Sequence, residues 1–231
     1  MPKGPGMPIR PLLLGHRGAR AEKSLPENSL ASFDRALVHG CDGFEFDVRL
    51  SADGVPVICH DATIRGIDVA HSPAPQLGLP LLRDVLKRYQ ATAFLDIELK
   101  VPGLETVTLD LLRAFTPRCG YVISSFLPEV LQTVHAIDAN VPLGLICETR
   151  AQFTRWPMQP VDYVISHHDL TKQNVIAEIK SAGKKVLVWT VNSVKDMKRF
   201  SKWGVDGIIS DDPERLAHTL MATLNPRPLR T

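Results

Sequence analysis

Eight short runs rich in apolar and β-branched residues alternate along this chain with segments of helical periodicity. Strands that alternate with helices indicate parallel βαβ units. Eight of them in 231 residues favour a closed (β/α)8 barrel, the TIM-barrel fold of the α/β class. A doubly wound open sheet is the alternative, but no glycine-rich dinucleotide motif follows the first run. The runs lie at residues 11–18, 43–50, 93–100, 121–126, 142–147, 162–168, 185–192 and 207–213, and the helical patterns at 28–40, 79–89, 104–115, 128–138, 171–183, 194–204 and 214–224.

One short extra strand is predicted after the second run. Residues 55–61, VPVICHD, are apolar enough for a strand, and the turn residues Asp53 and Gly54 lead into it. The chain has no linker-like segment and no shift of composition that would divide it. The sequence therefore predicts a single domain over residues 1–231, with its core at about 11–224.

Composition narrows the possible partners to a small molecule. The formal net charge is +2 and no basic run has interleaved aromatic residues, so neither nucleic acid nor an anionic membrane is indicated. No apolar stretch reaches the roughly 20 residues that span a bilayer, and the N-terminus lacks a signal-peptide run, so we expect a cytoplasmic protein. Four scattered cysteines without a CxxC pair favour reduced thiols over disulfides or zinc sites. The oligomeric state stays open.

Carboxylates interrupt the most strand-like segment of the chain, GFEFDVRL. Residues i and i+2 of a strand point to the same face. Phe44, Phe46 and Val48 therefore share one face, and Glu45 and Asp47 lie on the other. In a barrel the apolar face packs against the helices, and polar groups on the inner face are expected only near the functional mouth.

The run at 93–100 repeats this pattern, with Asp96 and Glu98 on its polar face. The carboxyl ends of barrel strands converge, so these groups should meet those of the previous strand. Oxygens from Glu45, Asp47 and Glu98, completed by water, would suit Mg²⁺ or Ca²⁺. The alternative is a purely structural ion network, because buried carboxylates need partners, and basic residues are close by in the sequence: Arg17, Arg49 and Lys100.

Two histidines end predicted strands beside charged residues. His16 closes the first run next to Arg17, and His60 closes the extra strand next to Asp61. A lone histidine is more often a satisfied core or surface group. A pair at one mouth can act as general base and general acid near neutral pH. The sequence leaves open which histidine would accept a proton and which would donate one.

Six sequence blocks occur between residues 12 and 217: HRGAR (16–20), PENSLASFDRAL (26–37), GCDGFEFDVRLSADGVPVICHD (40–61), DIELK (96–100), WTVN (189–192) and GVDGIISDDPERL (204–216). In combination and order they resemble the glycerophosphodiester phosphodiesterase family. The resemblance implies a barrel of the PLC-like phosphodiesterase type. It implies metal-dependent hydrolysis of glycerophosphodiesters to sn-glycerol 3-phosphate and an alcohol. The implied cofactor is one divalent cation, Mg²⁺ or Ca²⁺, with Mn²⁺ as a further candidate.

The resemblance assigns the chemistry to five residues. His16 and His60 match the two catalytic histidines of the family, and Glu45, Asp47 and Glu98 match its metal ligands. The nucleophile would be either the neighbouring hydroxyl of the glycerol moiety, which gives a cyclic phosphate that water then opens, or a water molecule that attacks directly.

Five other residues match substrate-binding positions of the family. Arg17 and Lys100 match basic residues near the phosphate, and Glu27 and Asn28 match a motif at the mouth. Trp189 matches an aromatic residue of the alcohol-side pocket. Asn28 could instead be only the N-cap of the helix that follows it, and Trp189 only a core aromatic.

The chain departs from the family between residues 62 and 78. The family carries a longer segment there, with a DRTTNG-like stretch of which Arg65 and Gly66 are remnants, so the substrate preference is open. A lysophospholipase D is one alternative, which an exposed apolar strip beside this segment would favour. A non-catalytic phosphodiester-binding barrel would be favoured by a missing histidine or metal ligand. A barrel aldolase or isomerase would need Lys100 as a Schiff-base lysine.

Overall fold

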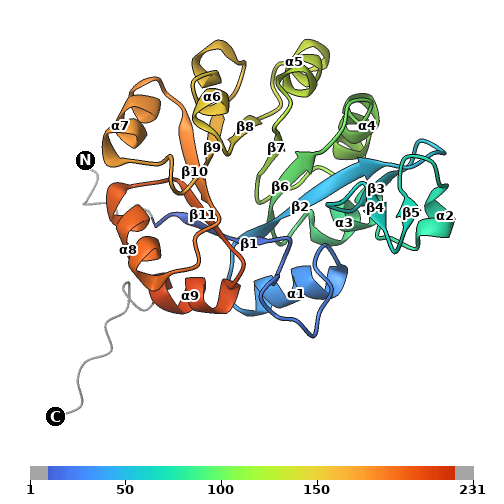
Figure 1. Cartoon of the computed structure of the whole chain (residues 1–231), viewed down its shortest axis with the longest axis horizontal. Coiled ribbons are helices and arrows are strands. Elements are labelled where there is room, and N and C mark those ends of the chain that lie inside the picture. Colours follow the sequence, from blue (N-terminus) through green and yellow to red (C-terminus); the bar gives the residue numbers. More distant parts are fainter. Residues whose placement is uncertain (1–9, 222–231) are drawn as a thin grey trace, which may run out of the picture.

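Eight parallel strands form a closed barrel in the computed structural model, which describes residues 10–221 (Figure 1). The strands pair in the order β1-β11-β10-β9-β8-β7-β6-β2, and β1 also pairs with β2, which closes the sheet. The predicted (β/α)8 barrel is therefore confirmed. The barrel strands are β1 (Leu12–His16), β2 (Gly43–Leu50), β6 (Phe94–Leu99), β7 (Tyr121–Ser125), β8 (Leu143–Cys147), β9 (Tyr163–His167), β10 (Lys185–Trp189) and β11 (Gly207–Ser210).

Helices lie around the outside of the barrel and connect successive strands (Figure 1). The connection from β8 to β9 contains only a one-turn helix, α6 (Arg150–Phe153), and a 3-10 turn (Trp156–Met158). The sequence predicts no helix there, because elements this short show no periodicity. Residues 222–224 of the last predicted helix lie outside the described residues. The longer helices are α1 (Leu30–Val38), α3 (Leu82–Tyr89), α4 (Glu105–Ala114), α5 (Pro128–Ile137), α7 (Gln173–Ser181), α8 (Val194–Trp203) and α9 (Pro213–Met221). None of the helices between residues 10 and 221 is long and apolar enough to cross a membrane.

The predicted extra strand is present as β3 (Pro56–Ile58), antiparallel to β2 and outside the closed barrel. It begins a small segment that continues with three short elements: β4 (Thr63–Ile64), β5 (Ile67–Asp68) and α2 (Ala74–Leu77). The apolar side chains of this segment bury one another in a satellite cluster that includes Cys59. Among the described residues, the large exposed apolar side chains all lie elsewhere in the chain: Val38, Ile137, Met158, Val194 and Met221. None of these five residues belongs to residues 62–78, whose Ile64 and Ile67 are partly buried.

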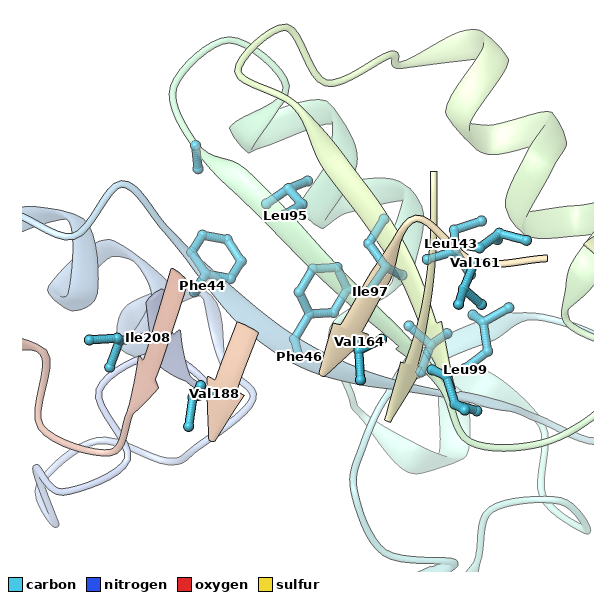
Figure 2. Packing of buried hydrophobic residues seen from close by; sticks show 14 of the residues in the cluster. Phe44, Phe46, Leu95, Ile97, Leu99, Leu143, Val161, Val164, Val188 and Ile208 are labelled. Atoms are coloured by element: carbon cyan, nitrogen blue, oxygen red, sulfur yellow. The ribbon is translucent and has the colours of Figure 1, made fainter. Parts of the chain in front are cut away.

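The apolar residues form two layers, one on each side of the barrel wall. The outer layer lies between strands and helices and includes the fully buried Phe44 and Phe46 (Figure 2). Phe44 stacks on Phe33 of α1 with ring centroids 4.2 Å apart. Alternation along the strands sends the intervening residues to the inside of the barrel. The inner layer includes Leu14, Val122, Ile165, Leu187 and Ile209.

Strand register brings the inward-facing polar residues of β1, β2 and β6 together. Asp47 lies opposite Glu98, and Glu45 lies opposite Asp96. On the other side of β2, His16 lies opposite Glu45. Three neighbouring strands thus place four carboxyl groups and one imidazole on one side of the barrel interior.

Candidate active site

Four inward-facing carboxyl groups form a buried acidic cluster at the ends of β2 and β6. Glu45, Asp47, Asp96 and Glu98 are each at most 6% exposed. Carboxylate oxygens of Glu45, Asp47 and Glu98 lie within 4.8 Å of one another. Oε1 of Glu45 and Oδ2 of Asp96 are buried without a hydrogen-bond partner among the described residues. The sequence places Asp96 on this face but does not suggest a role for it; its Oδ1 accepts a hydrogen bond from Ser124 at 2.6 Å.

The acidic cluster is electrostatically unbalanced. Burial and the neighbouring Asp47 carboxylate raise the pKa values of both Glu45 and Glu98. Asp47 behaves in the opposite way: although burial opposes ionisation, Lys100 and Arg17 hold its pKa below the ordinary value. Two of these carboxyl groups therefore lack enough positive charge nearby to ionise easily, whereas Asp47 has it.

Two basic side chains complete the inner ring of charges. The Arg17 guanidinium contacts Asp47 at 3.3 Å, and its backbone N–H donates to Glu45 Oε2 at 3.0 Å. Lys100 Nζ lies 2.7 Å from Glu98 and 3.3 Å from Asp47. The structure does not bring Arg49 into this ring, because Arg49 Nε donates to the backbone carbonyl of His60 at 2.8 Å, so Arg49 is not part of the ion network considered from the sequence.

The donor set fits a divalent cation. Arg17 and Lys100 together face four carboxyl groups, and the ion network still leaves Glu45 Oε1 without a donor. An unpaired buried carboxylate oxygen is costly, and hard carboxylate oxygens are the ligands that Mg²⁺ and Ca²⁺ prefer. Glu45, Asp47 and Glu98 would hold the ion.

His16 is held in place by Asp211, which comes from the far end of the chain. His16 Nδ1 lies 2.7 Å from Asp211 Oδ1, and Nε2 lies 3.8 Å from Glu45 Oε2. Despite partial burial, the hydrogen bond from His16 lowers the pKa of Asp211, so this carboxylate is ionised and only accepts. His16 therefore carries its proton on Nδ1, and Nε2 is left for chemistry. Two further donors hold Asp211 in place. The Asn192 amide donates to its Oδ2 at 2.7 Å, and the Arg20 guanidinium donates to its Oδ1 at 3.2 Å.

Sequence reasoning misses this role for Asp211. The local pattern Asp211-Asp212-Pro213 predicts only a helix cap. The structure gives the capping role to Asp212, whose Oδ1 accepts the backbone N–H of Arg215 at 2.9 Å. The contact from Asp211 to His16 spans 195 positions of the sequence, so only the closure of β11 onto β1 brings the pair together.

His60 lies beyond the end of β3, on the outer side of the mouth. Its Nδ1 lies 2.7 Å from Asp61 Oδ1. The hydrogen bond from His60 lowers the pKa of Asp61, so here too the carboxylate accepts and the imidazole carries its proton on Nδ1. The His60 side chain is 36% exposed, compared with 11% for His16. The two imidazoles thus have the same kind of partner, but one is open to solvent and the other is enclosed.

The mouth motif is tied directly to the acidic cluster. Asn28 is not the N-cap of α1, because Ser29 fills that position and accepts the N–H of Ser32. The Asn28 amide instead donates to Asp47 Oδ2 at 2.8 Å. Glu27 bridges two arginines, with one oxygen 2.7 Å from Arg17 and the other 2.8 Å from Arg20.

A cavity of about 330 Å³ opens above the acidic cluster. Both histidines, Arg17 and Lys100 line one side of it. Trp189 lines the apolar part of the cavity, where its ring packs edge-on against Phe126 with the two ring centroids 5.7 Å apart. The sequence places Phe126 at a strand end without a firm role. The other apolar lining residues are Ile146, Ile165 and Ile209.

A parallel barrel that brings buried acids, two bases and two imidazoles to one cavity has the groups that a hydrolytic barrel enzyme needs for acid–base catalysis. The family model of the glycerophosphoryl diester phosphodiesterases matches residues 16–109 and 79–215. The chain therefore belongs to the glycerophosphoryl diester phosphodiesterase family, and it is an enzyme, a phosphoric diester hydrolase that acts on glycerophosphodiesters.

Individual relatives agree with this assignment. A glycerophosphodiester phosphodiesterase of Caldanaerobacter subterraneus subsp. tengcongensis is 31% identical over 240 residues, covering 90% of this chain and 97% of that protein. A putative glycerophosphoryl diester phosphodiesterase from Silicibacter pomeroyi has the same fold, with a TM-score of 0.85, 23% identity and coverage of 94% and 95% of the two chains. An Oleispira antarctica phosphodiesterase, solved with the product sn-glycerol-3-phosphate, has a TM-score of 0.81 at 25% identity, covering 92% of this chain and 97% of that one.

Proposed function

We propose that this enzyme hydrolyses glycerophosphodiesters to sn-glycerol 3-phosphate and an alcohol with the help of one divalent cation, Mg²⁺, Ca²⁺ or Mn²⁺. The observation that carries the proposal is the buried Glu45 oxygen without a donor, in a cluster that faces the same cavity as both histidines. The product bound to the Oleispira antarctica relative supports the choice of substrate. Glu45, Asp47 and Glu98 would hold the cation, which supplies positive charge to the phosphate oxygens.

The environments of the two histidines suggest a division of labour. His16 Nε2, unprotonated and enclosed beside Glu45, accepts the proton of the attacking hydroxyl, which belongs to the glycerol moiety or to water. As the new P–O bond forms, the bond to the alcohol breaks, and the alcohol oxygen takes the proton that the cationic form of His60 holds on Nε2, while Nδ1–H stays on Asp61. Arg17 and Lys100 stabilise the negative charge that develops on the phosphoryl oxygens. Glu27 and Asn28 keep Arg17 and Asp47 in place.

The contacts of Lys100 argue against the aldolase or isomerase alternative. A Schiff-base lysine must lose its proton to become a nucleophile. Although burial opposes the charge, the Glu98 and Asp47 carboxylates raise the pKa of Lys100. It therefore serves better as a cation than as an amine. The non-catalytic alternative would be favoured by a missing histidine or acid, and none is missing.

The location we infer is cytoplasmic. The four cysteines, Cys41, Cys59, Cys119 and Cys147, are all free thiols, which supports a reducing compartment. Burial raises the pKa of Cys41 and Cys147 to about 12, so these two thiols stay protonated and serve packing.

The test is release of sn-glycerol 3-phosphate from glycerophosphoethanolamine by the wild-type enzyme and by His60→Ala. We expect release by the wild type and a fall in kcat of about 10²- to 10⁴-fold in the variant, the usual contribution of a general acid. His71→Ala is the matched control, since His71 lies in the same segment, is 83% exposed and pairs with Asp68 at 3.0 Å. Near-normal turnover by His60→Ala would contradict the proposal.

A further inference from the structure

A second cavity, of about 340 Å³, adjoins the catalytic one. It lies between the loop at residues 26–29 and the chain around residues 58–65 and 78–80. Among residues 10–221, His60 alone lines both cavities. Any group that leaves the phosphorus atom on the side of His60 therefore passes from the first cavity toward the second.

The second cavity has an uneven distribution of charge. Its two carboxylates are already paired: Glu27 with two arginines, and Asp61 with His60. Arg65 also lines the cavity, is exposed, and makes no ion pair or hydrogen bond with any of the residues 10–221. Its backbone has a φ of 51°, in the left-handed region, as in a tight turn of the shortened segment. The charge still available to a ligand there is positive.

The cavity is also poorly suited to a quaternary ammonium group. Such groups are recognised by the faces of Trp, Tyr or Phe rings, and none of the described residues that line this cavity is one of these three. Its one ring is the imidazole of His60, which is paired with Asp61. Its apolar contribution comes from aliphatic side chains such as Ile64 and Leu79. An alcohol with an anionic group can use the Arg65 guanidinium, whereas choline finds neither a Trp, Tyr or Phe ring nor an unpaired carboxylate.

We propose that this second cavity, and not the pocket beside Trp189 that the family resemblance implies, receives the leaving alcohol, and that Arg65 selects alcohols that carry an anionic group, such as a carboxylate. The proposal rests on the proposed function, in which His60 protonates the leaving alcohol. Arg65 acts on specificity alone, because it lies outside the cavity that holds the acidic cluster.

The test compares two substrates that differ by one carboxylate, glycerophosphoserine and glycerophosphoethanolamine. The measured quantity is the ratio of their kcat/KM values. We expect the wild type to favour the serine diester. Arg65→Ala should lower the ratio about threefold and Arg65→Glu about tenfold, as for one surface ion pair that is removed or reversed. Arg65→Lys should keep most of the preference.

Arg83→Glu is the control, since Arg83 is an exposed arginine of α3 that lines neither cavity. A ratio that stays the same in Arg65→Glu, or that falls equally in Arg83→Glu, would overturn the proposal. A wild-type enzyme that hydrolyses neither diester would instead contradict the proposed function. An active wild type whose ratio is insensitive to Arg65 would leave the proposed function intact and remove this inference alone.

Discussion

The two sides of the catalytic cavity differ in their chemistry: one consists of buried charged groups and the other mostly of apolar side chains. On the side of β2 and β6, four carboxyl groups lie buried with too few cations. On the side of β8 to β11, the lining is mostly apolar: Ile146, Ile165, Ile209 and Trp189 pack in one cluster. Glu148, just beyond β8, is the one charged residue of this side among the described lining residues. The acidic side depends on a ligand for its balance of charge, whereas the apolar side is complete by itself.

This difference suggests that the two sides contribute to different kinetic parameters. In the proposed function, the acidic side and the two histidines carry the charges and protons that change between ground state and transition state. The apolar side offers contacts that are the same in both states. Substitutions on the acidic side should therefore change kcat, and those on the apolar side KM.

Asp211→Asn should have a larger effect on turnover than any change on the apolar side. An amide can present a donor to His16 Nδ1 and favour the wrong tautomer, so we expect kcat to fall about 10- to 100-fold, as for other residues that orient a functional histidine. The measurement is kcat and KM of the folded variant, with kcat falling and KM staying near the wild-type value. Asp212→Asn, a change in the cap of α9, is the control. A purely structural role for Asp211 would lower stability and leave kcat of the folded enzyme where it was.

Trp189→Ala should have a smaller effect and a different signature. Loss of apolar contact area should raise KM about fivefold while kcat stays within about twofold. Trp189→Phe keeps a ring next to Phe126 and should restore most of the affinity. A loss in kcat as large as that of Asp211→Asn would remove the distinction between the two sides.

A third effect concerns stability and not turnover. Burial raises the pKa of Asp96 to about 7, whereas an unfolded aspartate has a pKa of about 3.9. Between these values the unfolded chain releases a proton that the folded state retains, so the cation-free protein loses stability as the pH rises, until about pH 7. Asp96→Asn cannot ionise. Its Tm in EDTA should exceed that of the wild type by about 10 °C at pH 8 and by almost nothing at pH 4.

Thermal unfolding of both proteins across this pH range checks the prediction. Asp110→Asn, a change at an exposed aspartate of α4, serves as the control. A difference in Tm between Asp96→Asn and the wild type that does not vary with pH would mean that Asp96 is ionised in the folded protein and already has a partner.

Features that depend on residues close together in the sequence could be predicted from it. The inner and outer faces of β2 follow from alternation within eight residues, and the structure has Phe44 and Glu45 on opposite sides of the barrel wall. The closed barrel follows from the order of the elements. These properties are local or repetitive, so a single sequence contains them.

Long-range partners could not be predicted in the same way. Asn28 contacts Asp47, and His16 contacts Asp211, only after the barrel has closed. A local capping role was enough to explain both Asn28 and Asp211 in the sequence, so their contacts with distant residues were not predicted. The direction of the Arg49 side chain, away from the acidic cluster, likewise depends on where the chain after β3 turns.

The central claim is that the acidic side of the cavity holds one divalent cation. Calorimetric titration of Mg²⁺ or Mn²⁺ into EDTA-treated protein tests it most directly. We predict one equivalent bound by the wild type and by Trp189→Ala, and an affinity at least about 10-fold lower for Glu45→Gln and Glu98→Gln. Absence of binding to the wild type at millimolar metal, or Glu45→Gln titrating like the wild type, would contradict the claim.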